Sequence, residues 1–131
     1  MKLFYALLLV VFTSPLFAQN TQNTDTIQCP AGVENVYSRP LYSDSLCSSF
    51  VIFIKKEVKL HKHLHHTEHV TVLDGEAIMT LGDKVFTVKK GDFIFIPKNT
   101  PHRVVTTSKT PLKVVSLQAP YFDGTDRVLL E

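Results

Sequence analysis

The stretch His61-Lys62-His63-Leu64-His65-His66-Thr67-Glu68-His69 holds five of the six histidines in this chain of 131 residues. Residues two apart on a strand point to the same side of the sheet, so His61 and His63 can face one ligand while Lys62 points away. Neutral imidazoles together with a carboxylate suit a divalent transition metal. The stretch therefore predicts a metal site carried by a β-strand.

The rest of the chain predicts an all-β protein. From Phe50 onward, short runs rich in β-branched and aromatic residues alternate with turn signals. Asp74-Gly75 and Gly82-Asp83 join such runs at hairpin spacing. After residue 18, no segment carries apolar residues at helical period. Many short strands in about 80 residues predict a closed barrel or a sandwich.

One run, Phe93-Ile94-Phe95-Ile96, is apolar at every position and stops at Pro97. Such a run is typical of a strand buried between two layers. We therefore expect Phe93 and Phe95 to pack in the core, together with Phe53 and Val72.

The N-terminus resembles an export signal. Residues 1–18 combine one positive charge, Lys2, with the apolar run Leu3–Phe12 and a small residue, Ala18, at the expected cleavage site. That run is short against the roughly 20 apolar residues of a membrane-spanning helix. We expect a signal peptide at 1–18, a polar lead-in and N-terminal segment at 19–49 and the barrel at 50–131. The mature protein is then periplasmic or secreted, with no membrane segment.

The mature chain is small and nearly neutral. Cleavage after residue 18 leaves 113 residues, enough for one core, and lowers the formal charge from +2 to +1 because Lys2 is the only charge removed. A charge this small gives no electrostatic basis for binding nucleic acid or an anionic membrane.

Cys29 and Cys47 are the only cysteines. In an oxidising compartment an even pair predicts a disulfide. Two free thiols are one alternative, and a redox or metal pair is another, although the spacing lacks the C-x-x-C pattern of such sites.

Two spaced motifs carry a family resemblance. His61-x-His63-(four residues)-Glu68-(six residues)-Gly75 resembles the first motif of the cupin superfamily, and Gly91-(five residues)-Pro97-x-Asn99-(two residues)-His102 resembles the second. The resemblance covers about residues 50–131 and implies a cupin-type jelly-roll barrel, or double-stranded β-helix. It also implies a divalent metal (Fe, Mn, Ni, Zn or Cu) held inside by His61, His63, Glu68 and His102.

Three positions depart from the family pattern without removing a ligand. Lys55 and Asn99 stand where the motifs have glycine, and Thr106 stands where the second motif ends in Asn. Asn tolerates a left-handed turn conformation better than most residues, so we expect the turn at Asn99 to survive.

Other histidine assignments are weighed against this set. A shifted pair, His63 and His65, leaves only two residues before Glu68, fewer than the family motif has. His66 and His69 are expected to be exposed or to lie behind the ligands, and His69 should face away from the metal. The remaining alternative is an incidental histidine-rich surface strand. The presence of Glu68 and the distant His102 at the positions of the family motifs disfavours it.

Two classes of function follow from the resemblance. One is a metalloenzyme acting on an oxygen-rich small molecule, as a dioxygenase, isomerase or lyase. The other is a non-catalytic module that binds a sugar or an organic acid. A proton-transfer group near the open metal position would favour isomerisation, and an apolar lining would favour binding or dioxygen chemistry.

The resemblance also bears on partners and on the tail of the chain. It implies a homodimer, as many relatives form. Tyr121, Phe122 and Arg127 either close over the barrel mouth or pack on its outside.

Overall fold

A computed structural model describes residues 21–130. The predicted signal peptide, residues 1–18, lies outside them. No helix in the described range is long and apolar enough to cross a membrane. Its elements are, in order, the 3-10 helix η1 (Thr24–Thr26) and the strands β1 (Val36–Ser43), β2 (Ser48–Ile54), β3 (Glu57–Lys62), β4 (Thr67–Asp74), β5 (Glu76–Leu81), β6 (Lys84–Lys89), β7 (Phe93–Ile96), β8 (His102–Thr106), β9 (Leu112–Ala119) and β10 (Val128–Leu129).

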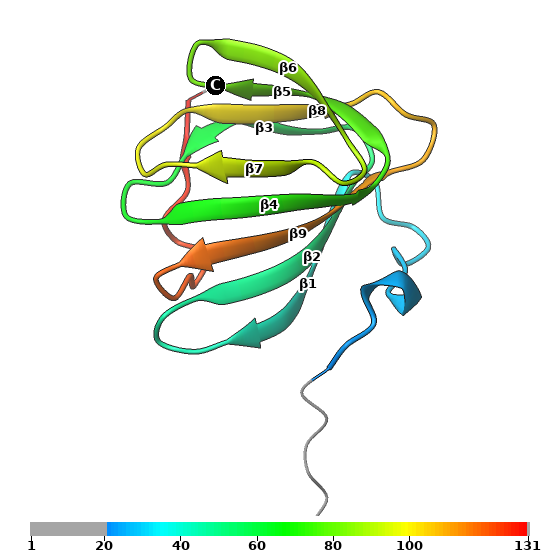
Figure 1. Ribbon diagram of the computed structural model, residues 1–131, viewed down its shortest axis with the longest axis horizontal. Coiled ribbons are helices and arrows are strands. Elements are labelled where there is room, and N and C mark those ends of the chain that lie inside the picture. Colours follow the sequence, from blue (N-terminus) through cyan, green and yellow to red (C-terminus); the bar gives the residue numbers. More distant parts are fainter. Residues whose placement is uncertain (1–20, 131) are drawn as a thin grey trace, which may run out of the picture.

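The strands form two antiparallel sheets of five, which face each other (Figure 1). One sheet has the order β1-β2-β9-β4-β7 and the other has the order β10-β3-β8-β5-β6. The chain crosses between the sheets repeatedly, so that β8 lies between β3 and β5, and β9 lies between β2 and β4. The prediction of an all-β jelly-roll barrel is confirmed. One strand, β1, lies before residue 50, in the segment assigned to the lead-in.

The core lies between the sheets because alternate residues of each strand point inward. In β9 every second residue is buried, beginning at Leu112. Burying an aliphatic side chain stabilises the fold by about 1.5–3 kcal/mol. The largest apolar cluster contains nine buried side chains, from both sheets: Ile54, Val72, Ala77, Met79, Val88, Ile94, Ile96, Leu112 and Val114.

The expectation that Phe93 and Phe95 pack in the core is wrong. Their side chains are 61% and 49% exposed, whereas the alternate residues Ile94 and Ile96 are buried. The two phenylalanines lie on the outer face of β7, where their rings pack edge-on against His69. The other sheet packs on the inner face of β7, and among the described residues no further sheet covers the outer face. Phe53 and Val72 are buried, as predicted.

The disulfide prediction is also wrong, since Cys29 and Cys47 are both free thiols. Cys29 packs against a small cluster that includes Val51, in the middle of β2. Cys47 immediately precedes β2, and its backbone N–H donates to the Asp44 carboxylate in the β1–β2 turn, at 3.0 Å. The two cysteines thus lie in different surroundings, Cys29 beside an apolar cluster and Cys47 at the β1–β2 turn.

Two turns have backbone conformations that explain their residue types. Gly75, between β4 and β5, has φ +83°, and a Cβ there would lie 2.8 Å from the carbonyl oxygen of Pro111. Asn99 has φ 58°, so the left-handed turn expected at this position is confirmed. The backbone N–H of Asn99 donates to the carbonyl of His63 at 2.6 Å, which ties the β7–β8 connection to the histidine stretch.

Candidate metal centre

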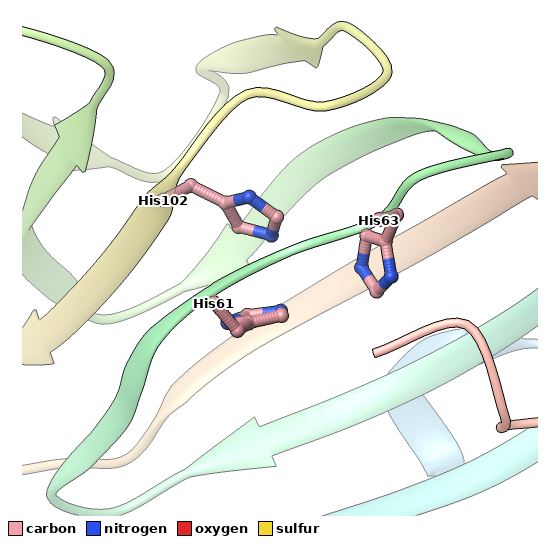
Figure 2. A group of neighbouring side chains, drawn as sticks. All are labelled: His61, His63 and His102. Carbon is pink, nitrogen blue, oxygen red and sulfur yellow. The ribbon is translucent and has the colours of Figure 1, made fainter. Parts of the chain in front are cut away.

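Three buried histidines converge inside the barrel. His61, at the end of β3, and His102, at the start of β8, are paired across the two strands, and their ring centroids are 4.1 Å apart. His63 follows β3 and points to the same side as His61. One nitrogen from each ring lies within 4.8 Å of the others (Figure 2). These three residues are the three-histidine group, and they can hold a metal ion.

The hydrogen bonds of the three-histidine group set the direction of its lone pairs. The Nδ1 atom of each ring faces a backbone carbonyl: that of Lys59 at 2.8 Å for His61, that of Thr100 at 2.9 Å for His102, and that of Asp126 for His63. A carbonyl oxygen only accepts, so each Nδ1 carries a proton, and in the neutral ring Nε2 keeps its lone pair. A metal ligand requires this tautomer.

Glu68 reaches the same place from the opposite sheet. Its Oε2 atom lies 3.5 Å from Nε2 of His63 and 3.6 Å from Nε2 of His102. Its other oxygen, Oε1, accepts a 2.5 Å hydrogen bond from the Ser116 hydroxyl on β9. Ser116 thus fixes the carboxylate so that Oε2 faces the histidines. The structure brings all four predicted ligands, His61, His63, Glu68 and His102, together.

The protonation states of these groups follow from burial and from their partners. Burial and the charge of His102 lower the pKa of His61 to about 4, so His61 is neutral at pH 7. Burial alone would raise the pKa of Glu68, but the neighbouring His102 and His63 imidazoles and the hydrogen bond from Ser116 outweigh it and hold that pKa well below its usual range. Burial opposes protonation of His63, yet its bonds to Glu68 and to Asp126 raise its pKa.

A divalent transition metal fits this donor set. Nε2 of His102 is buried without a hydrogen-bond partner among the described residues, and a buried polar atom of that kind requires an explanation. A metal would accept its lone pair together with those of His61 and His63. Three imidazoles and one carboxylate match the N/O ligands of such metals and leave one or two positions open.

The C-terminal segment supports the site from outside. Figure 1 shows it crossing the end of the barrel beyond β9. The Asp126 carboxylate accepts backbone N–H groups of Leu64 and His65, each at 2.8 Å, and the Nδ1 proton of His66 at 2.5 Å. Burial alone would raise the pKa of Asp126, but the bonds from His66, His65 and Leu64 outweigh it and hold that pKa well below its usual range. Asp126 thereby fixes the loop between His63 and Glu68.

The remaining histidines lie away from the three-histidine group. His65 is exposed, which disfavours the shifted ligand set. His66 is buried, with Nδ1 on Asp126 and Nε2 2.9 Å from the carbonyl of Tyr121. His69 packs outside the barrel against Phe93 and Phe95, so the expectation that it faces away from the metal is confirmed.

A cavity of about 260 Å³ opens beside the four predicted ligands. Most of its wall is aliphatic, with valine and isoleucine from both sheets and Met79 from β5. Phe122 and Arg127 line it, so these two residues of the tail close over the mouth, while Tyr121 is 52% exposed. The other polar side chains in the wall are Ser38, Arg103 and Gln118.

Three residues of this site were not found from the sequence: Ser116, Gln118 and Asp126. The alternation of inward and outward residues in β9 could have indicated two of them, because Ser116 and Gln118 lie on the same inward face as Leu112 and Val114. A polar side chain on such a face marks either a partner or a site. No motif surrounds Asp126, and only the folded tail brings it to the histidine loop.

The fold and the four grouped side chains define a small β-barrel with a candidate metal site in its interior. Residues 50–118 match the family model described as "Cupin domain", and the chain belongs to this family.

The similar proteins cover different extents of this chain. An uncharacterized protein of Methanocaldococcus jannaschii is 36% identical over 81 residues, which are 62% of this chain and 65% of that protein. Mannose-1-phosphate guanylyltransferase of Salmonella muenchen is 33% identical over 67 residues, or 51% of this chain and 14% of that enzyme. The chain thus spans less than two thirds of either relative.

A solved structure extends the likeness in fold. A conserved protein of Klebsiella pneumoniae with a double-stranded β-helix domain superposes with a TM-score of 0.67 at 22% identity. The match covers 90% of this chain and 98% of that one.

Proposed function

We propose that the protein is a metalloenzyme that binds one divalent transition metal through His61, His63, Glu68 and His102 and carries out dioxygen chemistry on a small, mainly apolar molecule. The observation that carries this proposal is the chemistry of the cavity wall. When bound, the metal would supply a Lewis acid or, as iron, a site for dioxygen activation.

Among residues 21–130, the cavity wall offers no separate base for proton transfer. Apart from the four predicted ligands, the only ionisable side chains that line it within residues 21–130 are Arg103 and Arg127. Arginine stays protonated in proteins and cannot accept a proton. Isomerases and lyases that abstract a proton need a positioned base, so dioxygen chemistry suits this wall better.

The cavity lining also supports a second candidate, a binding module. A preformed, mainly apolar cavity with a few polar groups is what a small-molecule binding site requires. A sugar ligand for such a module is supported by the similarity to mannose-1-phosphate guanylyltransferase of Salmonella muenchen, although the match covers only 14% of that enzyme. The aliphatic wall weighs against a sugar, because it leaves most hydroxyl groups without hydrogen-bond partners.

The open coordination position is tested with nitric oxide, which stands in for dioxygen. Residues 19–131 are purified without a His-tag, freed of metal, loaded anaerobically with Fe(II) and exposed to nitric oxide. We expect one iron per chain and the electron paramagnetic resonance signal of a high-spin iron–nitrosyl, both lost in His63→Ala and both kept in His65→Ala. Iron that binds without forming the nitrosyl would contradict the enzyme and favour the binding module.

The proposal also covers location and assembly. The signal-peptide pattern of residues 1–18 supports a periplasmic or secreted protein. Fractionation of cells that express the full chain tests this, with the mature protein expected outside the cytoplasm. A homodimer is proposed from the family resemblance alone, and sedimentation of the mature chain tests it.

A further inference from the structure

We infer that the cavity takes a small 2-hydroxy or 2-oxo acid with an apolar body, and that Gln118 and Arg127 select it. The inference rests on the proposed metal site, because an oxygen of such an acid would occupy an open coordination position. It adds two residues to the site and a chemical class for the ligand.

Gln118 is a buried amide placed beside the metal ligands. It is 5% exposed, and it is paired in register with Glu68 on one neighbouring strand and with Ser48 on the other. Cross-strand partners point to the same face, so its side chain enters the barrel next to the Glu68 carboxylate. Its Oε1 atom is buried without a hydrogen-bond partner among the described residues.

A buried amide without hydrogen-bond partners is better explained by a role in binding a ligand than by packing in the core. Packing alone would be served as well by an apolar residue, since an amide without its hydrogen bonds is costly to bury. Glutamine has both donors and an acceptor on one group. It can therefore accept from a 2-hydroxyl or donate to a 2-oxo oxygen on a molecule bound at the metal.

Arg127 supplies the charge at the mouth. Its side chain lines the cavity, and its positive charge contributes to lowering the pKa of His61. Within residues 21–130 its guanidinium has no acidic partner, whereas the other arginine of the wall, Arg103, is paired with Glu57 at 2.6 Å. A guanidinium presents two parallel donors that match a carboxylate.

The cavity is polar at one end and apolar at the other. Along β9 the inward side chains change from Leu112 and Val114 to Ser116 and Gln118. On the neighbouring strand β4, the residues paired with Val114 and Gln118 change in the same way, from Val72 to Glu68. A ligand with its polar group at the metal would therefore place its body among aliphatic side chains. The volume of about 260 Å³ lies just below the roughly 300–1,000 Å³ of sites for drug-sized ligands, so that body is small.

The inference is tested by calorimetric titration of the Zn(II)-loaded mature chain with three compounds. The probe is 2-hydroxy-4-methylpentanoate, which has the proposed head and an aliphatic body. Its primary amide keeps the shape without the charge, and glycerate keeps the head with a polar body. We expect the probe to bind at least about tenfold more tightly than either comparison compound, as one charged hydrogen bond or one buried aliphatic group would give.

Two variants and a matched control assign the residues. Arg127→Gln should weaken the hydroxy acid about fivefold or more while changing the amide less than about twofold, since only the acid can pair with the guanidinium. Gln118→Leu should weaken both about tenfold, because both carry the 2-hydroxyl. Arg39→Gln changes an exposed arginine outside the cavity and should alter neither.

Zinc content measured on the same samples separates the two possible failures. Absence of stoichiometric zinc would overturn the proposed metal site and this inference with it. One zinc per chain with equal binding of all three compounds, or with no effect of either cavity variant, would overturn the ligand class and leave the metal site standing.

Discussion

The two ends of the barrel interior are built on the same strands but have different chemistry. At one end the inward side chains of β9 and β4 are Leu112, Val114 and Val72, which belong to the main apolar cluster. At the other end the same faces carry Ser116, Gln118 and Glu68, opposite the three-histidine group. Alternation decides which side chains enter the barrel, and position along the strand decides whether they serve stability or binding.

This difference predicts that the two ends respond separately to substitution. The apolar end should control the free energy of unfolding, and the polar end should control metal affinity. Sites without shared partners generally contribute additively.

Removing one ligand should have the largest effect. Zinc sites bind with about 10–16 kcal/mol distributed over four ligands, so His63→Ala should weaken Zn(II) binding about a hundredfold or more. A competition titration against a chelator measures this, and an affinity within about tenfold of wild type, less than a lost ligand would cost, would show that His63 is no ligand.

A cavity at the apolar end should destabilise the fold and spare the metal. Leu112 is 2% exposed, and Leu112→Ala should lower the free energy of unfolding of the metal-free protein by about 2–5 kcal/mol. Urea denaturation measures this change. Val85→Ala, at a 67% exposed position, is the control and should change stability by less than about 0.5 kcal/mol. A large loss of metal affinity in Leu112→Ala would show that the two ends are coupled.

The buried imidazole of His61 should make stability depend on pH. Its pKa is about 4 in the folded protein, against 6.5 when unperturbed. As pH falls from about 6.5 to about 4, the unfolded chain takes up a proton that the folded protein refuses. Stability of the metal-free protein should therefore fall over that window, by up to about 3 kcal/mol from this group.

Comparing wild type with His61→Asn isolates the contribution of His61 to the pH dependence of stability. The raised pKa of His63 changes the stability in the opposite direction. Protonated His63 stabilises the fold at low pH, and this stabilisation is lost as pH rises through the pKa of His63 in the folded protein. The depressed pKa of Glu68 adds a loss of stability at lower pH, below the ordinary glutamate pKa of 4.5. Urea midpoints measured from pH 7 to pH 4 should fall less in His61→Asn than in wild type, and equal slopes would contradict the assignment.

Support from the C-terminal tail should have a smaller effect on the metal. Asp126→Asn removes the charge that holds the loop between His63 and Glu68, and we expect Zn(II) affinity to fall about tenfold, as for other partners behind a metal ligand. Asp123→Asn is the matched control, because the hydrogen bonds of the Asp123 carboxylate within residues 21–130 stay in its own turn, to Thr125. Equal affinities of the two variants would show that the tail does not position the site.

The smallest effects should come from the histidines outside the barrel. His65→Ala and His69→Ala should each change Zn(II) affinity by less than about twofold, because neither ring reaches the site and each surface group has little energetic weight. The same chelator competition measures them. A loss comparable with that of His63→Ala would support the shifted ligand set.

The sequence predicted the barrel and the grouping of the ligands because both depend on short-range patterns. Strand alternation placed His61 and His63 on one side, and the family resemblance of the two motifs implied Glu68 and His102. The left-handed turn at Asn99 also followed from residue type. These features need only the local backbone and the spacing of a few residues.

The features that were predicted wrongly or missed depend on how distant segments of the chain pack. Phe93 and Phe95 share an apolar run with Ile94 and Ile96, but they point to the outer face of β7, which the other sheet does not cover. Asp126 reaches the site through a tail that follows the last long strand. Such contacts between distant segments are invisible to periodicity.

The most direct test of a metal centre at the polar end is the anomalous scattering of a Co(II)-loaded crystal. The structure predicts one peak per chain, bonded to Nε2 of His61, His63 and His102 and to Oε2 of Glu68, with at least one further coordination position facing the cavity. A peak held by His65, His66 or His69 instead, or none between β3, β8 and β4, would contradict the metal centre.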